Sequence, residues 1–142
     1  MSKINSNEIL IKSAVEAMDK AYVPYSGFRV GAVLETEDGK LYQGCNIENA
    51  AYSPCNCAER TAFFRAVFEG ERNFKRICIV GGKGGRLEGF TAPCGVCRQV
   101  MMEFCDYDYF EILLARSTDE YKVYKLKELL PEGFGPLNLR RQ

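Results

Sequence analysis

The sequence of 142 residues contains no histidine. Imidazole is the commonest metal ligand and the commonest general base in proteins, so this absence narrows the chemistry open to the chain. Any transition metal must be held by cysteine or carboxylate side chains. Proton transfer must fall to aspartate, glutamate, lysine, tyrosine or cysteine.

A long apolar run is also absent, and so is an excess of charge. No apolar stretch approaches the ~20 residues that a membrane-spanning helix needs, and the polar N-terminus lacks the apolar segment of a signal peptide. The 19 basic residues balance the 19 acidic ones, which gives no electrostatic reason to expect a nucleic acid partner. We therefore expect neither membrane association nor a polynucleotide ligand.

Cysteine, in contrast, is abundant, with seven residues. Seven is an odd number, and the spacings Cys55–Cys57 and Cys94–Cys97 are too tight to favour disulfides within each pair. A reducing, cytoplasmic location is therefore expected, with the thiols binding metal or lying buried.

The hydrophobic periodicity predicts a single α/β domain over residues 1–142. Strands joined by helices indicate a partly parallel sheet with helices on both faces and an antiparallel hairpin at one side. The predicted helices are residues 7–22, 57–70, 94–104 and a short turn at 126–130. The predicted strands are residues 28–34, 41–46, 76–80, 110–115 and a weaker edge strand at 121–124. Residues 37–40 are a predicted hairpin turn, and 47–56 and 81–85 are predicted loops.

Three cysteines carry the strongest chemical pattern. Cys94 and Cys97 have the C-x2-C spacing of a zinc half-site and would share one helix face, and Cys57 can complete the set. Cys57 would lie at the N-terminus of one helix and the other two cysteines at the N-terminus of another, and helix N-termini favour thiolates. Three thiolates leave one tetrahedral position open, and Glu59 follows Cys57 by two residues. Such a site points to hydrolysis, with Arg60 as the candidate cation that offsets the thiolate charge.

Other interpretations of these residues remain open at this point. A closed structural zinc site would use Cys55 or another thiol as its fourth ligand. A redox C-x-x-C motif is less favoured, because Cys94 does not directly follow a thioredoxin-type strand. The glycine-rich residues 81–85 lack the Walker and Rossmann spacings, which favours a plain turn over a phosphate-binding loop.

The segments Cys57-Ala58-Glu59 and Pro93-Cys94-Gly95-Val96-Cys97 resemble the C-A-E … P-C-x-x-C signature of the zinc-dependent cytidine deaminases. The likeness extends over most of the chain, through residues 22–32, 44–50 and 129–136. It implies a three-layer α-β-α sandwich with a mixed sheet of about five strands. It also implies a small homotetrameric enzyme with pockets shared between subunits.

The resemblance further implies roles for individual residues. Cys57, Cys94 and Cys97 would hold one zinc ion per chain, Glu59 would be the proton shuttle, and Arg60 would hydrogen-bond the ligand sulfurs. The implied substrate-binding residues are Phe28 against the pyrimidine, Asn46 and Glu48 at the ribose hydroxyls, Ala58, and Phe134 in a neighbouring subunit's pocket. The alternative for Phe28 and Phe134 is simple packing in the core. The alternative for Asn46 and Glu48 is that they are ordinary polar residues of a loop. The basic, glycine-rich residues 81–85 depart from the family pattern at a place that could border the pocket.

The function expected from the sequence is hydrolytic deamination of cytidine and deoxycytidine to uridine and deoxyuridine, with release of ammonia, in pyrimidine salvage. Blasticidin S is the closest alternative substrate. A structural zinc-binding module and a deaminase acting on nucleic acid are the alternatives from other classes.

Overall fold

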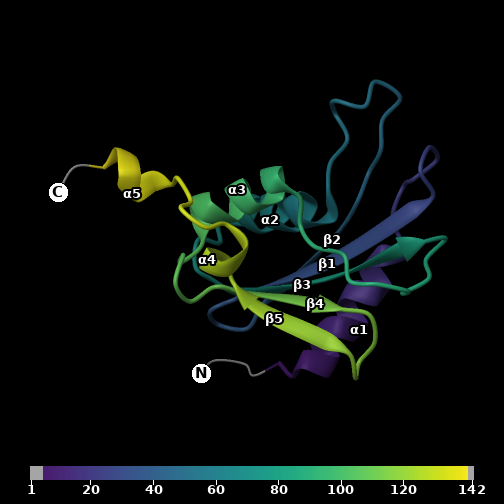
Figure 1. Cartoon of the computed structure of the whole chain (residues 1–142), viewed down its shortest axis with the longest axis horizontal. Helices are drawn as coiled ribbons and strands as arrows, with labels where there is room; N and C mark the ends of the chain where they lie inside the picture. The colour runs from purple at the N-terminus through teal and green to yellow at the C-terminus, as the bar shows by residue number, and fades with distance from the viewer. Residues whose placement is uncertain (1–4, 141–142) are drawn as a thin grey trace.

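Five strands form one mixed sheet in the computed structural model of the chain, which describes residues 5–140 (Figure 1). The strand order is β2-β1-β3-β4-β5, and only the β3–β4 pair is parallel. The strands are β1 Phe28–Thr36, β2 Leu41–Cys45, β3 Phe74–Lys83, β4 Glu111–Ala115 and β5 Tyr121–Lys125. The parallel pair follows from the chain path, since a helix crosses over between β3 and β4.

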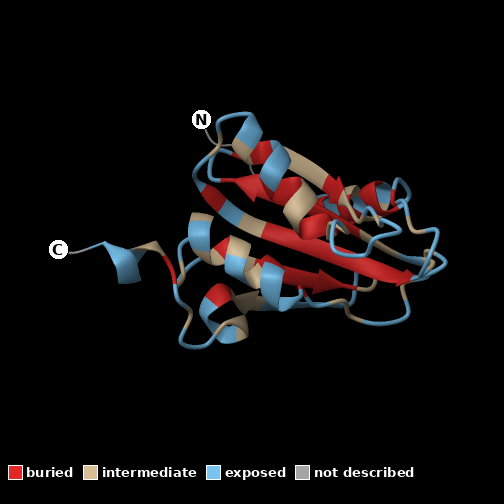
Figure 2. Ribbon diagram, turned by 90° about the horizontal axis from the view of Figure 1, so that it is seen from above, coloured by how far each residue is buried: buried red, intermediate tan, exposed pale blue. Residues whose placement is uncertain are grey.

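Helices cover both faces of this sheet (Figures 1 and 2). The helix α1, Asn7–Met18, packs on one face, and α2, Ala58–Phe68, lies with α3, Gly95–Phe104, on the other. The two short helices are α4, Leu126–Leu129, and α5, Pro136–Leu139. Alternate residues of each strand face opposite sides, so Leu34 packs toward α2 and Val33 toward α1. The predicted three-layer α/β fold is confirmed.

Local signals placed several helix ends correctly. The Ser6 hydroxyl accepts a hydrogen bond from the Ile9 amide and caps α1. Gly70, at φ 94°, ends α2, where the amides of Gly70 and Glu71 donate to Val67 and Ala66. The prediction that the first helix reaches Tyr22 was wrong. The backbone of Tyr22 pairs instead with the segment after β2, where the Tyr22 amide donates to the Asn46 carbonyl at 3.0 Å.

The predicted loop at residues 81–85 was also partly wrong. Gly81 and Gly82 belong to β3, opposite Val30 and Arg29 of β1. A Cβ at Gly82 would lie 1.5 Å from the carbonyl oxygen of Arg86, so glycine serves there for close backbone approach and not for a turn. The turn itself begins beyond Lys83. Within residues 5–140, no helix is both long and apolar enough to cross a membrane.

A close contact between α2 and β2 sets the position of the first turn of α2. A Cβ at Gly44 would lie 2.4 Å from the Ala58 carbonyl oxygen and 2.5 Å from the Ala62 amide nitrogen. Both alanines are fully buried. The missing side chain at Gly44 therefore lets α2 begin directly against the sheet, which fixes the residues around position 58.

Gly44→Ala should lower the free energy of unfolding by about 1–3 kcal/mol, the usual cost of overpacking a filled interior. Urea denaturation measures this change. Gly89→Ala is the matched control, because a Cβ at Gly89 meets nothing within 4 Å. Equal stability of the two variants would contradict the close contact described here.

Candidate metal centre and active site

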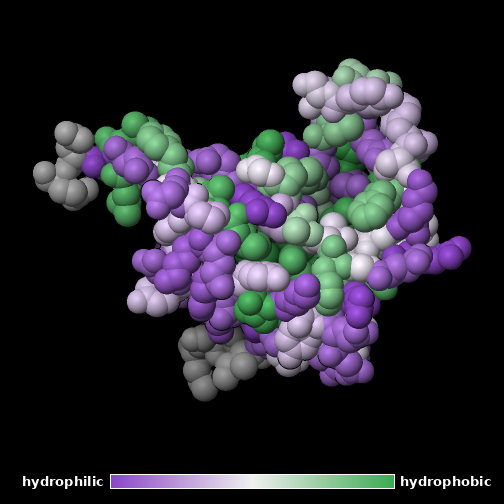
Figure 3. All heavy atoms as spheres, in the orientation of Figure 1, coloured by the Kyte–Doolittle hydropathy of each residue, from purple (hydrophilic) through white to green (hydrophobic). Residues whose placement is uncertain are grey.

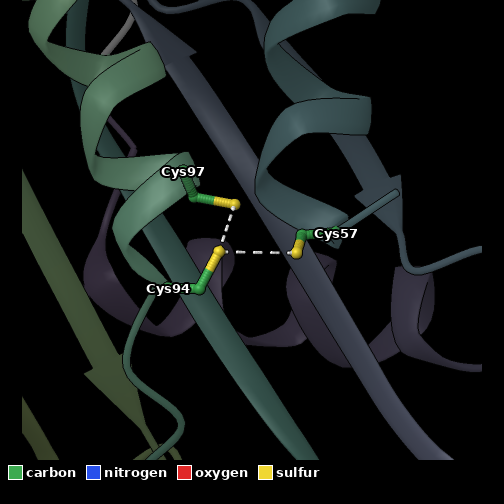
Figure 4. Close-up of side chains that lie close together, drawn as sticks. All are labelled: Cys57, Cys94 and Cys97. Carbon is green, nitrogen blue, oxygen red and sulfur yellow. Dashed lines mark hydrogen bonds between the residues drawn. The ribbon is translucent and has the colours of Figure 1, made fainter. Parts of the chain in front are cut away.

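Three thiols meet where the N-termini of α2 and α3 converge (Figure 4). Cys57 and Cys94 are the N-cap residues of the two helices, and Cys97 lies in the first turn of α3. The Cys94 sulfur is 3.7 Å from the Cys57 sulfur and 3.6 Å from the Cys97 sulfur. The structure thus brings together all three ligands suggested by the sequence.

The spacing of the sulfurs fits a tetrahedral zinc ion. Zn–S bonds of about 2.3 Å at tetrahedral angles place ligand sulfurs about 3.8 Å apart, close to the separations found here. The free N–H groups and dipoles of two helix N-termini favour thiolates at this point. The cluster is suited to one metal ion held by three protein ligands.

Cys55 takes no part in this cluster. Its sulfur accepts a hydrogen bond from the Asn49 amide at 3.2 Å, and among the described residues the candidate metal ligands are only Cys57, Cys94 and Cys97. The three thiols therefore leave one tetrahedral position without a cysteine, as a catalytic zinc site requires. The closed four-cysteine alternative finds no fourth thiol in this part of the structure.

Positive charge at the sulfurs comes from Arg60, one turn along α2. Its Nη2 donates to the Cys57 sulfur at 3.2 Å. The Cys97 thiol, Arg60 and Cys94 lower the pKa of Cys57 to about 5, against an opposing effect of burial. The Nε of Arg60 is buried and has no hydrogen-bond partner among the described residues. The guanidinium therefore contacts the thiolate cluster through Nη2 and not through Nε.

Glu59 is buried beside the cluster, with only 3% of its surface exposed. Burial is the main cause that raises its pKa to about 7, and the negative charge of Cys57 adds to the increase. The Glu59 charge acts in turn on Cys97, so the carboxylate lies within electrostatic reach of two ligands without joining the ligand set. Helical periodicity alone could not predict that the Glu59 carboxylate lies this close to the ligands.

Asn46 and Glu48 lie just beyond β2 and bind the backbone at the start of β1. The Asn46 side chain accepts from the Val30 amide and donates to the Phe28 carbonyl, each at 2.9 Å. The Glu48 carboxylate accepts from the Tyr25 and Ser26 amides at 3.0 and 3.1 Å and from the Ser26 hydroxyl. These hydrogen bonds lower the pKa of Glu48, with the Ser26 hydroxyl making the largest contribution.

The remaining sequence-derived candidates occupy different surroundings. Phe28 opens β1 and is 39% exposed, while Ala58 opens α2 and is fully buried. Phe134 is 57% exposed on the C-terminal segment, where its carbonyl accepts from the Gln99 side chain at 2.8 Å. Core packing is therefore not the role of Phe28 or Phe134 within this chain.

Sequence reasoning missed Ser26, whose amide and hydroxyl both bind Glu48. The motif around residues 22–32 contained it, but no periodic or spacing signal marks a residue whose partner lies 22 positions away.

Cys97→Ser should purify with little bound zinc, because a hydroxyl is a far weaker zinc ligand than a thiolate. Cys55→Ser should keep one zinc ion per chain. Elemental analysis of the two purified variants beside the unmodified protein makes the comparison. Loss of zinc from Cys55→Ser would restore the four-cysteine alternative.

Known proteins share both the sequence and the fold. Residues 4–110 match the model of the cytidine and deoxycytidylate deaminase zinc-binding region. A cytidine deaminase of Sporosarcina psychrophila is 47% identical over 132 residues, covering 93% of each chain. The crystal structure of the Burkholderia pseudomallei cytidine deaminase superposes with a TM-score of 0.84 at 45% identity, over 92% of this chain and 100% of that one. The Mycobacterium tuberculosis cytidine deaminase gives 0.79 at 32% identity, over 94% and 100%. The chain belongs to the zinc-dependent cytidine and deoxycytidylate deaminase family.

Proposed function

We propose that this protein hydrolyses cytidine and deoxycytidine to uridine and deoxyuridine with release of ammonia, as a step of pyrimidine salvage. The observation that carries the proposal is a zinc-type cluster of three thiols, with one ligand position open, beside the buried carboxylate of Glu59. Together with the family membership, this arrangement supports a hydrolytic site. A structural metal site would not need the buried acid.

The chemistry divides between the metal and Glu59. Bound zinc supplies a Lewis acid that lowers the pKa of a coordinated water toward neutrality. The Glu59 carboxylate would take one proton from that water and deliver it to the ring nitrogen beside the amino-bearing carbon, while the water oxygen bonds to that carbon. Glu59 would then carry the remaining proton of that oxygen to the amino group, the bond between carbon and the amino nitrogen breaks, and ammonia leaves as the carbonyl of the uracil ring forms. Burial raises the pKa of Glu59 above the usual value of a glutamate, which suits a group that must both accept and donate protons.

Residues around the cluster would hold the nucleoside. Asn46 and Glu48 offer an amide and a carboxylate, which together can accept from and donate to a diol. Phe28 offers an exposed ring for the pyrimidine. The Ala58 side chain is buried, so its contribution to binding would come from backbone groups at the start of α2, where N–H groups have no partner within the helix.

The purified protein should convert cytidine to uridine, followed by ultraviolet absorbance, while holding one zinc per chain. Glu59→Gln should keep its zinc and lose about 10²–10⁴ in kcat, the usual contribution of general acid–base catalysis. Glu8→Gln, on the exposed surface of α1, is the matched control. Normal turnover by Glu59→Gln would exclude the shuttle role. Zinc without turnover on cytidine, deoxycytidine or blasticidin S would favour a structural metal site.

The proposal extends to a cytoplasmic homotetramer with pockets shared between subunits. All seven cysteines are free, which suits a reducing compartment. Apolar side chains are exposed on α2, where Phe68 is 85% exposed, and on α5, where Leu137 and Leu139 project outward. Figure 3 shows apolar atoms of α5 on a segment that extends away from the body of the molecule. Exposed apolar groups of this kind mark interaction surfaces, and Phe134 lies on the same segment.

Light scattering should give a mass about four times the 16.0 kDa of the chain.

Phe134→Ala should lower kcat/KM about tenfold or more, because burying a phenylalanine contributes about 1.5–3 kcal/mol. Tetramers assembled from equal amounts of Phe134→Ala and Glu59→Gln chains should recover about a quarter of the wild-type activity, since some sites then combine two intact residues from different subunits. A monomer in solution, or no recovery in mixed tetramers, would contradict shared pockets.

A further inference from the structure

Lys83 ends β3 on the face of the sheet that carries the metal cluster. In the sheet register it pairs with Phe28 of β1. Ile77 and Ile79, which precede it at two-residue spacing, pack in the cluster that includes the α2 residues. Because strand side chains alternate between faces, Lys83 projects to the same side as Ile79. The lysine thus stands beside the ring proposed to bind the pyrimidine.

The ammonium of Lys83 binds the turn that precedes β1. Its Nζ donates to the Ser26 carbonyl at 2.7 Å, and the amide of the next residue, Gly84, donates to the Gly27 carbonyl at 2.8 Å. Gly27 has φ 68°, a conformation that glycine adopts without strain but also leaves easily. Two hydrogen bonds from the end of β3 therefore hold a turn whose own backbone is permissive.

The opposite side of this turn binds Glu48. The amides of Tyr25 and Ser26 and the hydroxyl of Ser26 all donate to its carboxylate. The same Ser26 hydroxyl accepts from the Phe28 amide at 3.0 Å, which ties the turn to the start of β1. Ser26 therefore links Lys83, through its carbonyl, to Glu48, through its amide and hydroxyl.

We propose that Lys83 is a positioning residue that fixes the Tyr25–Gly27 turn and, through it, the carboxylate of Glu48 for binding the ribose hydroxyls. The inference rests on the proposed function, in which Glu48 contacts the sugar. Lys83 acts on affinity and not on proton transfer, because its contacts lie with the turn and not with the metal ligands. A hydrogen bond from a charged ammonium is roughly twice as strong as one between neutral groups, and here it is joined by the hydrogen bond from the Gly84 amide to the same turn.

Lys83→Met removes the donor while keeping most of the apolar stem. The KM for cytidine should rise about threefold to tenfold, the effect of losing one net hydrogen bond, with kcat nearly unchanged. The KM for 2′,3′-dideoxycytidine should not change, because this nucleoside lacks the hydroxyls that Glu48 would bind. Lys83→Arg should return the cytidine KM toward the wild-type value, because its guanidinium can also donate to the Ser26 carbonyl.

Arg86→Met is the matched control. Arg86 is exposed three residues after Lys83, and its guanidinium donates no hydrogen bond within residues 5–140, so the variant removes one positive charge without touching Ser26. Its kinetic constants should equal those of the unmodified protein. A matching rise in KM for Arg86→Met would assign the effect to charge and overturn the proposal, as would an equal rise of KM for both nucleosides in Lys83→Met.

A measurement without substrate separates this inference from the proposed function. Amide hydrogen exchange at Tyr25 and Ser26 should be faster in Lys83→Met than in Arg86→Met. Unchanged exchange, or faster exchange with an unchanged cytidine KM, overturns the positioning role. Glu48→Gln tests the ribose contact itself: if this variant raises the cytidine KM and Lys83→Met does not, only the inference fails. If Glu48→Gln leaves the KM unchanged, the ribose contact in the proposed function fails.

Discussion

The site depends on two helices that begin at the same point in space. The α2 helix starts directly against β2 because Gly44 leaves no side chain between them. At the start of α3, Arg98 donates to the Pro93 carbonyl at 2.8 Å and to the Leu129 carbonyl at 2.6 Å, which joins the helix to the C-terminal part of the chain. Sulfurs must lie within a few tenths of an ångström of the tetrahedral spacing to share one ion. The contacts that hold the two helix starts therefore set the spacing of the sulfurs, on which metal binding depends.

The absence of histidine has an electrostatic consequence at this point. Three thiolates around a divalent ion leave a net negative charge, which weakens its action as a Lewis acid. Arg60 and the helix N-termini oppose that charge. Burial is the main cause that raises the pKa of Glu59, and the negative charge of Cys57 adds to the increase. The buried carboxyl group beside this ligand set is the group proposed to carry protons between the water and the substrate.

Local sequence signals correctly predicted helix ends and turns, which are formed by contacts between residues close in the chain. Ser6 caps a helix, Gly70 ends one, and the turn containing Gly39 closes the hairpin, each through contacts within a few residues. The spacing of Cys94 and Cys97 likewise belongs to a single helix turn. Glycine misled the prediction at Gly82, because its role there is set by the Arg86 carbonyl, which only the folded chain brings close. The burial of Glu59 and the link from Lys83 to Ser26, 57 residues apart, depend in the same way on tertiary structure.

The residues proposed to bind the sugar, Asn46 and Glu48, also hold the start of β1 and the turn before it in place. Asn46 joins the amide of Val30 to the carbonyl of Phe28, and Glu48 collects three donors from the turn before β1. Side chains already fixed by such contacts lose little freedom when a ligand binds, which favours affinity. This arrangement depends on the hydrogen bonds between the end of β3 and the turn around Gly27, because the backbone of that turn is permissive. Recognition of a small nucleoside would then depend on a strand end whose side chains need never touch it.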